Sequence, residues 1–300
     1  MILILLILLF VCIVLPLLFA WRIWRLDERT RGGWFVIVAD SMVFVLLILM
    51  VGRWDIAGYY TRLPLLALLA VATALSWRRH ADRPWRSEDG PALWRSHGTT
   101  MLSLAFFGCA AVYVAAGYFP SEEPRPLSFP LEGGRFMVAQ GGGNPLLNHH
   151  SGHPAQDHAA DIVAINAAGF HTGGLQPDDP ARYVVWNKPV VSPCDGTVRE
   201  ARDGLPDLPP PQADPENPAG NHVVIACEGL LVELAHLRQG SVEVAAGDEI
   251  QAGERIGAVG NSGNTTEPHL HIHAVDAATG EAVPISFGGT IPVRNRTFSR

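Results

Sequence analysis

An almost unbroken apolar run from Met1 to Ala20 is the feature that most constrains how this chain can fold. The run is long enough to cross the hydrocarbon core of a bilayer as one helix. No basic residue precedes it, no convincing small-residue cleavage site ends it, and its arginines follow the apolar stretch. A cleaved signal peptide has the opposite arrangement. We therefore expect a retained transmembrane helix.

Three further apolar stretches in the first 120 residues predict three more transmembrane helices. They cover residues 34–51, about 63–77, and 99–118. Asp40 interrupts the first of these stretches. A polar residue inside a span is by default a functional candidate. We expect instead that Asp40 is satisfied by water or a hydroxyl partner.

Arginines in the connecting loops predict the orientation of these helices. Residues 21–33 hold four arginines and residues 78–97 hold five, whereas the loop between the second and third helices holds two. Loops rich in Lys and Arg stay on the cytoplasmic side of a membrane. With four helices, both termini and everything after Pro120 are then expected on the opposite side.

The composition changes sharply after residue 120. Residues 1–120 hold 11 Lys and Arg and 7 Asp and Glu, a formal charge of +4, whereas residues 121–300 hold 11 and 22, a formal charge of −11. Ten of the 12 histidines also lie in the second part. Nucleic-acid binding requires a basic surface, so this acidic, His-rich part is predicted not to bind nucleic acid.

Residues 121–133 are predicted to be a Pro- and Glu-rich linker between a transmembrane region (1–120) and a β-rich domain (134–300). Three prolines and two glutamates within 121–130 resist regular structure. Beyond Gly134, short apolar runs separated by Gly and Pro predict strands and no helix of ordinary length. The expected strands are 182–191, 196–201, 222–226, 230–235, 242–244, 255–259 and 269–275. Six prolines in 205–218 predict a surface loop.

The four cysteines divide evenly between the two parts. Cys12 and Cys109 lie in apolar runs, where a thiol is an ordinary small hydrophobic group. Cys194 and Cys227 lie in the polar part, and a disulfide between them is permitted if that part is outside the cytoplasm.

Histidines in the second part have the spacing of a metal site. In Pro268-His269-Leu270-His271, both imidazoles fall on the same face of a strand, because side chains alternate along it. Two imidazoles, one carboxylate and an open position make a catalytic zinc site. No H-E-x-x-H motif is present, so a glutamate base on a helix is not expected.

These histidines and the segments around them resemble the lysostaphin/LytM-type zinc metallopeptidase family of peptidoglycan endopeptidases. The resemblance runs from about Asn148 to Val275 and includes the segments 189–198, 220–225, 234–237, 247–257 and 260–271 in the family's order. It implies a mainly antiparallel, LytM-like peptidase domain that follows the helices and holds one Zn²⁺ per chain. It also implies peptide hydrolysis without a covalent enzyme intermediate.

The resemblance assigns roles to four of the residues. By position, His271 and Asp161 are expected to be zinc ligands. His236 and His269 match the family's two histidines that do not bind zinc. Some group must handle the proton and the developing oxyanion, and these two histidines are the expected catalytic residues. His273 lies on the same face beyond the motif and is expected to be structural.

The third zinc ligand lies where this sequence departs from the usual family pattern. The common H-x-x-x-D spacing would place a histidine at the position of Asp157. The N-x-H pattern of 148–150 and the Q-x-x-A-x-D pattern of 156–161 resemble a subgroup in which His150 is the ligand. His149, His153 and His158 remain alternatives.

The sequence thus predicts a membrane-anchored zinc metalloendopeptidase that hydrolyses peptide bonds in peptidoglycan. It is expected in the bacterial cytoplasmic (inner) membrane as a multi-pass protein, with the catalytic domain on the periplasmic or extracellular side. Its expected partners are peptidoglycan peptides and the lipid bilayer. The alternative is a catalytically degenerate domain that acts as a regulatory binding module for other wall hydrolases. A third interpretation is a membrane sensor or transporter accessory protein in which the helices carry the function.

Overall fold

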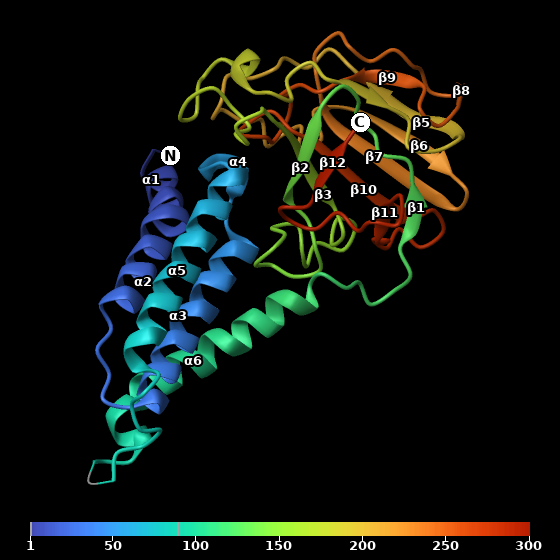
Figure 1. The fold of residues 1–300 in the computed structure, drawn as a ribbon. Helices are drawn as coiled ribbons and strands as arrows, with labels where there is room; N and C mark the ends of the chain where they lie inside the picture. The colour runs from blue at the N-terminus through green and yellow to red at the C-terminus, as the bar shows by residue number, and fades with distance from the viewer. Residues whose placement is uncertain (1, 89) are drawn as a thin grey trace. The chain divides into compact units, whose positions relative to one another are not determined.

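The computed structural model describes residues 2–88 and 90–300, and the chain divides into two compact units (Figure 1). Leu3–Ala116 form a helical unit, and Gly117–Arg300 form a β-rich unit. Four long apolar helices are therefore followed by a mainly antiparallel β domain, which confirms the predicted fold class.

The helical unit contains four stretches that are long and apolar enough to cross a membrane, judged by length and composition. They are Leu3–Arg25, Arg31–Val51, Tyr59–His80 and Leu93–Ala116. The helices are α1 (Ile2–Leu9), a π-helical segment (Phe10–Val14), α2 (Leu15–Arg25), α3 (Arg31–Val51), α4 (Trp54–Ala57), a 3-10 turn (Tyr59–Thr61), α5 (Arg62–His80) and α6 (Leu93–Ala116). The third stretch is longer than predicted because its helix continues through polar residues at both ends.

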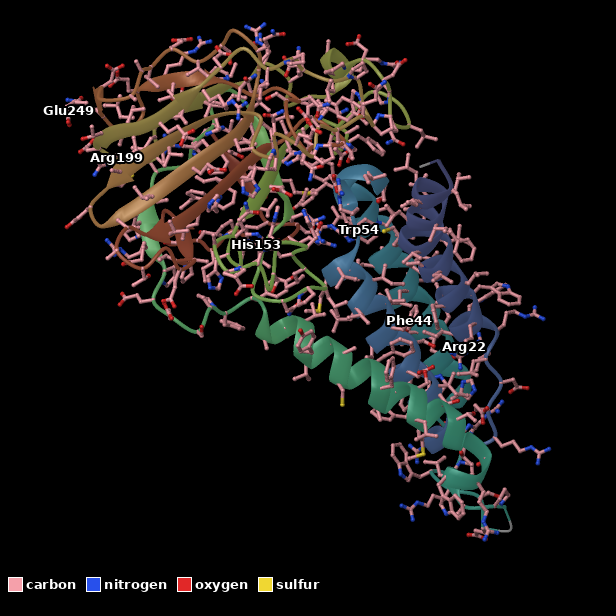
Figure 2. The ribbon with its side chains drawn as sticks, turned by 180° about the vertical axis from the view of Figure 1, so that it is seen from behind. Arg22, Phe44, Trp54, His153, Arg199 and Glu249 are labelled. Atoms are coloured by element: carbon pink, nitrogen blue, oxygen red, sulfur yellow. A yellow bond between two sulfur atoms is a disulfide. The ribbon has the colours of Figure 1, made fainter. Side chains whose placement is uncertain are left out.

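Asp40 of α3 is buried and bonds to side chains from two other helices. Arg22 of α2 places Nη1 3.2 Å from its Oδ2, and the Ser103 hydroxyl of α6 donates to its Oδ1 at 2.6 Å. Near this pair, the rings of Phe19 and Phe44 also join α2 to α3, with centroids 4.9 Å apart (Figure 2). Asp40 thus has the hydroxyl partner that was expected, and Arg22 compensates its charge.

An eight-stranded antiparallel sheet forms the frame of the β-rich unit, in the order β12-β2-β3-β10-β7-β6-β5-β8 (Figure 1). Its strands are β2 (Arg135–Gln140), β3 (Ala160–Ile165), β5 (Gly196–Arg202), β6 (Asn221–Cys227), β7 (Leu230–Leu237), β8 (Glu249–Ile250), β10 (Leu270–Asp276) and β12 (Thr297–Ser299). Two small sheets accompany it, an antiparallel pair of β4 (Pro189–Val191) and β9 (Arg255–Ala258) and a parallel pair of β1 (Arg125–Leu127) and β11 (Ile285–Phe287).

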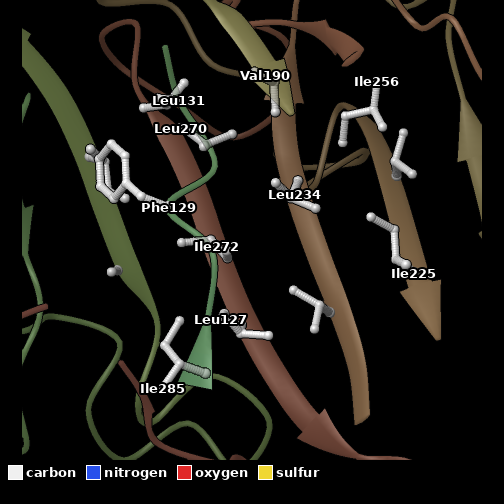
Figure 3. Close-up of a cluster of buried hydrophobic side chains, with 14 of the residues drawn as sticks. Leu127, Phe129, Leu131, Val190, Ile225, Leu234, Ile256, Leu270, Ile272 and Ile285 are labelled. Carbon is white, nitrogen blue, oxygen red and sulfur yellow. The ribbon is translucent and has the colours of Figure 1, made fainter. Parts of the chain in front are cut away.

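One face of the large sheet carries the hydrophobic core (Figure 3). Alternate residues of the three central strands lie in this core: Ala160, Ile162 and Ala164 of β3, Leu270, Ile272 and Ala274 of β10, and Leu230, Val232 and Leu234 of β7. Because successive side chains of a strand point to opposite faces, the intervening residues share the other face of the sheet. Those residues include Asp161, His271 and His273.

Part of the predicted linker belongs to the folded β-rich unit. Leu127, Phe129 and Leu131 are almost fully buried, and they contact the core beside Leu270 and Ile272 (Figure 3). The first of them ends β1, which pairs with β11. The segment therefore differs from the extended tether that was expected. Its apolar residues recur with period two, as in a strand. The intervening prolines hid this pattern, although edge strands tolerate proline.

The remaining strands match the prediction in part. The structure has β5, β6, β7, β9 and β10 close to the expected positions. Only the end of 182–191 is a strand, because a 3-10 turn at Pro180–Arg182 and irregular backbone precede β4. Residues 242–244 form no strand. β3 was missed because all six of its residues are buried, so it lacks the alternation that marks a half-exposed strand.

Cys194 and Cys227 form a disulfide, with their Cα atoms 6.1 Å apart. It connects the turn before β5 to the end of β6. Within the described residues, Cys12 and Cys109 take part in no disulfide. A disulfide of this kind persists in oxidising compartments and is rare in the cytosol.

Candidate metal centre and active site

Asp161 and His271 face each other across two hydrogen-bonded strands. They are directly paired in the antiparallel register of β3 and β10, and both point to the face opposite the core. Directly opposite residues on one sheet face are the closest side-chain neighbours that a sheet provides. His271 Nδ1 accordingly lies 2.9 Å from Asp161 Oδ1. Both side chains are at most 6% exposed.

His150 reaches the same carboxylate from the loop between β2 and β3. Its Nε2 lies 3.1 Å from Asp161 Oδ1 and 3.2 Å from Oδ2. The buried Asn148 holds this loop in shape, because its amide donates to the carbonyls of Gly142, Asp157 and Ala159 while its Oδ1 accepts the His150 backbone N–H. The N-x-H pattern therefore has a local physical purpose: the asparagine fixes the backbone that presents the histidine.

The alternative upstream histidines lie in different surroundings. His149 is 60% exposed, and its Nδ1 is 3.9 Å from Asp161 Oδ2. His158 approaches Asp157 at 4.0 Å, and His153 is exposed in the same loop (Figure 2). Asp157 accepts hydrogen bonds from Ser151 and Gly152 and so stabilises a turn. Of the four histidines, His150 has the shortest contact with Asp161.

The residues around Asp161 fit a zinc ion. Within the described parts of the chain, the ion-pair partners of Asp161 are all histidines: His149, His150, His269 and His271. Neutral imidazoles leave a buried carboxylate without a compensating charge, which is costly. A divalent cation between His150 Nε2, His271 Nδ1 and a carboxylate oxygen would supply that charge, and these are donor types that zinc prefers.

The charge of Asp161 is well stabilised for a ligand role. Burial alone would raise the pKa of its carboxyl group. The electrostatic interaction with His269 and the hydrogen bonds from His150 and His271 outweigh burial and hold that pKa well below its ordinary value. The group is therefore an anion throughout the physiological pH range.

His236 is placed beside these residues by an unusual backbone conformation. Its φ is 63°, in the left-handed region that few residues other than glycine adopt. Leu234 and Leu237, three residues apart, both lie in the core, which a regular strand would not allow. The left-handed residue interrupts the alternation, and the His236 ring lies 4.8 Å from the ring of His269 and 5.9 Å from that of His271. Strained backbone of this kind clusters at active sites.

His236 and His269 are held in the same tautomer. His236 Nδ1 lies 3.0 Å from the Ser262 carbonyl oxygen, and His269 Nδ1 lies 2.8 Å from the Glu267 carbonyl oxygen. A carbonyl oxygen only accepts hydrogen bonds, so each Nδ1 carries the proton and each Nε2 has a lone pair. The Nε2 of His269 is 3.6 Å from Asp161 Oδ1. Burial, together with His269 and His271, also holds the pKa of His236 well below its ordinary value, which keeps the ring neutral.

The carbonyl of Ser262 is fixed in turn by close packing against Gly220. A Cβ atom at Gly220 would overlap with the Ser262 carbonyl, and the φ of Gly220 is 62°. The Ser262 hydroxyl donates to the Leu237 carbonyl at 2.7 Å and accepts the Asn221 N–H at 2.9 Å. The segment that orients His236 is thus bonded to both neighbouring strands, β6 and β7.

The predicted surface loop 205–218 is attached to this region. Asp207 accepts the backbone N–H groups of Asn261 and Gln239, and the Asn261 amide donates to the Leu208 carbonyl. Partial burial raises the pKa of Asp207 above its ordinary value. The loop is irregular, as predicted, and these bonds hold it next to Ser262 and His236.

Two further residues adjoin the centre and were not predicted to belong to it. His273 Nδ1 lies 3.1 Å from His271 Nε2, and Glu233 is directly opposite His273 in the register of β7 and β10. Burial, and the nearby His271, lower the pKa of His273 to about 3. The H-x-H-x-H alternation was the only sequence signal for His273, and Glu233 had none.

Residues 183–283 match the model of Peptidase family M23. The family resemblance seen in the sequence is thereby confirmed for this M23 segment. His236, His269 and His271 lie inside the segment, whereas His150 and Asp161 lie upstream of it.

Comparison with known proteins gives a further relative of this chain. An uncharacterized metalloprotease of Haemophilus influenzae is 29% identical over 141 residues, which cover 46% of this chain and 27% of the relative. The chain therefore spans about a quarter of the length of that protein.

Solved structures give weaker likenesses. A zinc-containing peptidase from Vibrio cholerae is 20% identical with a TM-score of 0.34, covering 53% of this chain and 39% of that one. A putative peptidase M23 from Pseudomonas aeruginosa is 16% identical with a TM-score of 0.32, covering 59% of this chain and 57% of that one. At these scores, neither structure bears on the function of this chain.

Proposed function

We propose that this chain is a membrane-anchored zinc metalloendopeptidase that hydrolyses peptide bonds in peptidoglycan. One observation carries the proposal: His150 and His271 converge on the buried carboxylate of Asp161, while His236 and His269 stand beside them. The Nδ1 of His236 and of His269 faces a backbone carbonyl, so the neutral form of each ring has its lone pair on Nε2. Three ligands and two free imidazoles make up a hydrolytic zinc site with one position open for water or substrate.

The chain's own residues have distinct tasks in this proposal. His150, Asp161 and His271 would hold the metal. Zinc bound there supplies a Lewis acid for a peptide carbonyl and an acidified water as the nucleophile. His269 Nε2, 3.6 Å from Asp161 Oδ1, is in a position to accept the proton of the attacking water. His236 is the second imidazole available for proton transfer or for stabilising the oxyanion.

The peptidoglycan substrate and the membrane setting rest on two kinds of support. The family resemblance supplies the substrate class. The four apolar helices supply the anchor, and the Arg-rich loops favour a catalytic unit outside the cytoplasm. The disulfide between Cys194 and Cys227 agrees with that side of the membrane, because it needs an oxidising compartment.

Metal content and peptide release from peptidoglycan test the proposal together. Full-length protein in detergent should contain one zinc per chain and should release soluble peptides from purified peptidoglycan. His271→Ala should lose both properties. His222→Ala removes a buried histidine of β6 that bonds to Gly220 and Glu200, away from the three ligands, and should keep both. A folded, zinc-free wild-type protein that binds peptidoglycan without cutting it would instead support the regulatory binding module.

A further inference from the structure

A chain of three polar side chains extends from the proposed zinc ligand His271 along the face of the sheet that lies opposite the core. His271 and His273 are two residues apart on β10, and Glu233 is the residue of β7 directly opposite His273. One nitrogen of each histidine and one carboxylate oxygen of Glu233 lie within 4.8 Å of one another. Both histidines are buried, with exposed fractions of 3% and 8%.

The two ring nitrogens of His271 have different partners. Nδ1 faces Asp161 at 2.9 Å, and Nε2 faces His273 Nδ1 at 3.1 Å. A nitrogen that binds a metal must present a lone pair, so a metal at Nδ1 leaves the proton of a neutral His271 on Nε2. That proton points at His273 Nδ1, which must then be the acceptor.

This arrangement determines the proton position on His273 as well. If Nδ1 of His273 accepts, the proton of its neutral ring lies on Nε2. The Nε2–H group is then the donor of that ring. Glu233, directly opposite His273, has a carboxylate oxygen within 4.8 Å of one His273 nitrogen. With a metal at Nδ1 of His271, the hydrogen bond between the two histidines therefore has one direction, from His271 Nε2–H to His273 Nδ1.

We propose that His273 is a positioning residue for the zinc ligand His271, fixing the tautomer and the ring orientation of that ligand. The inference rests on the proposed function, because it requires a metal at Nδ1 of His271. Partners of this kind make a bound imidazole a better ligand, and their loss typically weakens metal affinity by about 10–100-fold. In this chain the partner of the zinc ligand is the imidazole of His273, two residues further along β10.

The first test is the zinc affinity of the full-length protein in detergent, measured by competition with a chromophoric chelator. His273→Leu removes the acceptor and should weaken zinc binding by about 10–100-fold. His273→Asn can offer an oxygen near the position of Nδ1 and should recover most of the affinity. His222→Leu, a matched loss of a buried histidine from the same sheet, should bind zinc like the wild type. Equal affinity of His273→Leu and the wild type would overturn the proposal.

The second test uses the unmutated chain, so it remains decisive if His273→Leu does not fold. Histidine labelled with ¹⁵N, in the zinc-loaded full-length protein, reports which ring nitrogen carries a proton. We expect protonated Nε2 and unprotonated Nδ1 on His273. A proton on Nδ1 of His273, or a second zinc bound at His273, would overturn the proposal. A wild type that binds no zinc would refute the proposed function itself, and with it this inference.

Discussion

Asp161 and His271 are 110 residues apart in the sequence and directly opposite each other in the sheet, with 2.9 Å between Oδ1 and Nδ1. Strand pairing creates this contact, so the relative position of the two proposed ligands is set by the most regular part of the fold. His150, in contrast, comes from a loop that needs Asn148 to hold it in place. The sheet thus positions two of the proposed ligands, and a loop held by the Asn148 side chain positions the third.

Asp161→Asn should abolish tight zinc binding, although it changes the size and shape of the side chain very little. The substitution removes the anion around which the imidazoles converge. Loss of an outer partner alone costs about 10–100-fold in metal affinity, so loss of this ligand should cost more than about 100-fold. A zinc competition titration measures the effect. Asp157→Asn is the matched control, because Asp157 caps a turn at Ser151 and Gly152 and should leave the affinity nearly unchanged.

His236→Ala and His269→Ala should each slow peptide release while zinc remains bound. Proton transfer by a positioned side chain contributes about 10²–10⁴-fold to rate, and each variant should lose an amount in that range. Zinc content and release rate are measured on the same samples. A variant that loses its zinc, or one that cuts as fast as the wild type, would contradict the assigned role.

A fragment that begins at residue 134 should be much less stable than one that begins at residue 121. The shorter fragment lacks Leu127, Phe129 and Leu131, which are almost fully buried in the core. Each contributes about 1.5–3 kcal/mol by burial, so their loss approaches the total stability of a typical domain, about 5–15 kcal/mol. Urea unfolding of the two fragments tests this. Equal midpoints would mean that the segment 121–133 is a free linker after all.

The disulfide between Cys194 and Cys227 should stabilise the β-rich unit by about 2–4 kcal/mol, the usual range for bridges that close loops of tens of residues. Thermal unfolding of fragment 121–300 with and without reductant measures the contribution. Cys194→Ser in combination with Cys227→Ser should unfold like the reduced protein and should be insensitive to reductant. A reductant effect that persists in this double variant would point to a different cause.

The metal-free fragment 121–300 should lose stability as the pH falls below about 6.5, the ordinary pKa of histidine. Burial lowers the pKa of His273 to about 3 in the folded state. Between these two values the unfolded chain binds a proton that the folded chain does not, so the free energy of unfolding decreases toward acid. One such group costs about 1.4 kcal/mol per pH unit, or about 2 kcal/mol between pH 6.5 and 5. His273→Leu should flatten this slope, and an unchanged slope would contradict the assignment.

The sequence indicated β5, β6, β7, β9 and β10, because their short apolar runs, separated by Gly and Pro, are typical of strands. In β10 and in the first part of β7, every second residue is apolar and lies in the core, and the same alternation placed His269 and His271 on one face. β3 carries no such pattern, because it is buried on both faces, and β1 was hidden by its neighbouring prolines. The pairing of β1 with β11 and the burial of Leu127, Phe129 and Leu131 reveal that this segment belongs to the β-rich unit.

Only those residues of the candidate site that belong to local sequence motifs could be predicted. His236, His269, His271 and Asp161 followed from local patterns, and the structure brings their side chains together. The left-handed conformation of His236 depends on its bonds to Ala219 and Gly260, which lie on other segments. The place of Glu233 beside His273 depends on strand register, which no local pattern encodes.

The separation of Asp161 and His271 along the chain has a consequence during biosynthesis. A ribosome delivers β3 more than 100 residues before β10, and the pairing that joins the two proposed ligands cannot form until both have emerged. An incomplete chain that ends before residue 271 therefore contains His150 and Asp161 without their third partner. Under the proposed function, a nascent or truncated protein that lacks β10 has no hydrolytic centre, and the cell is protected from its own peptidase until that strand has been made.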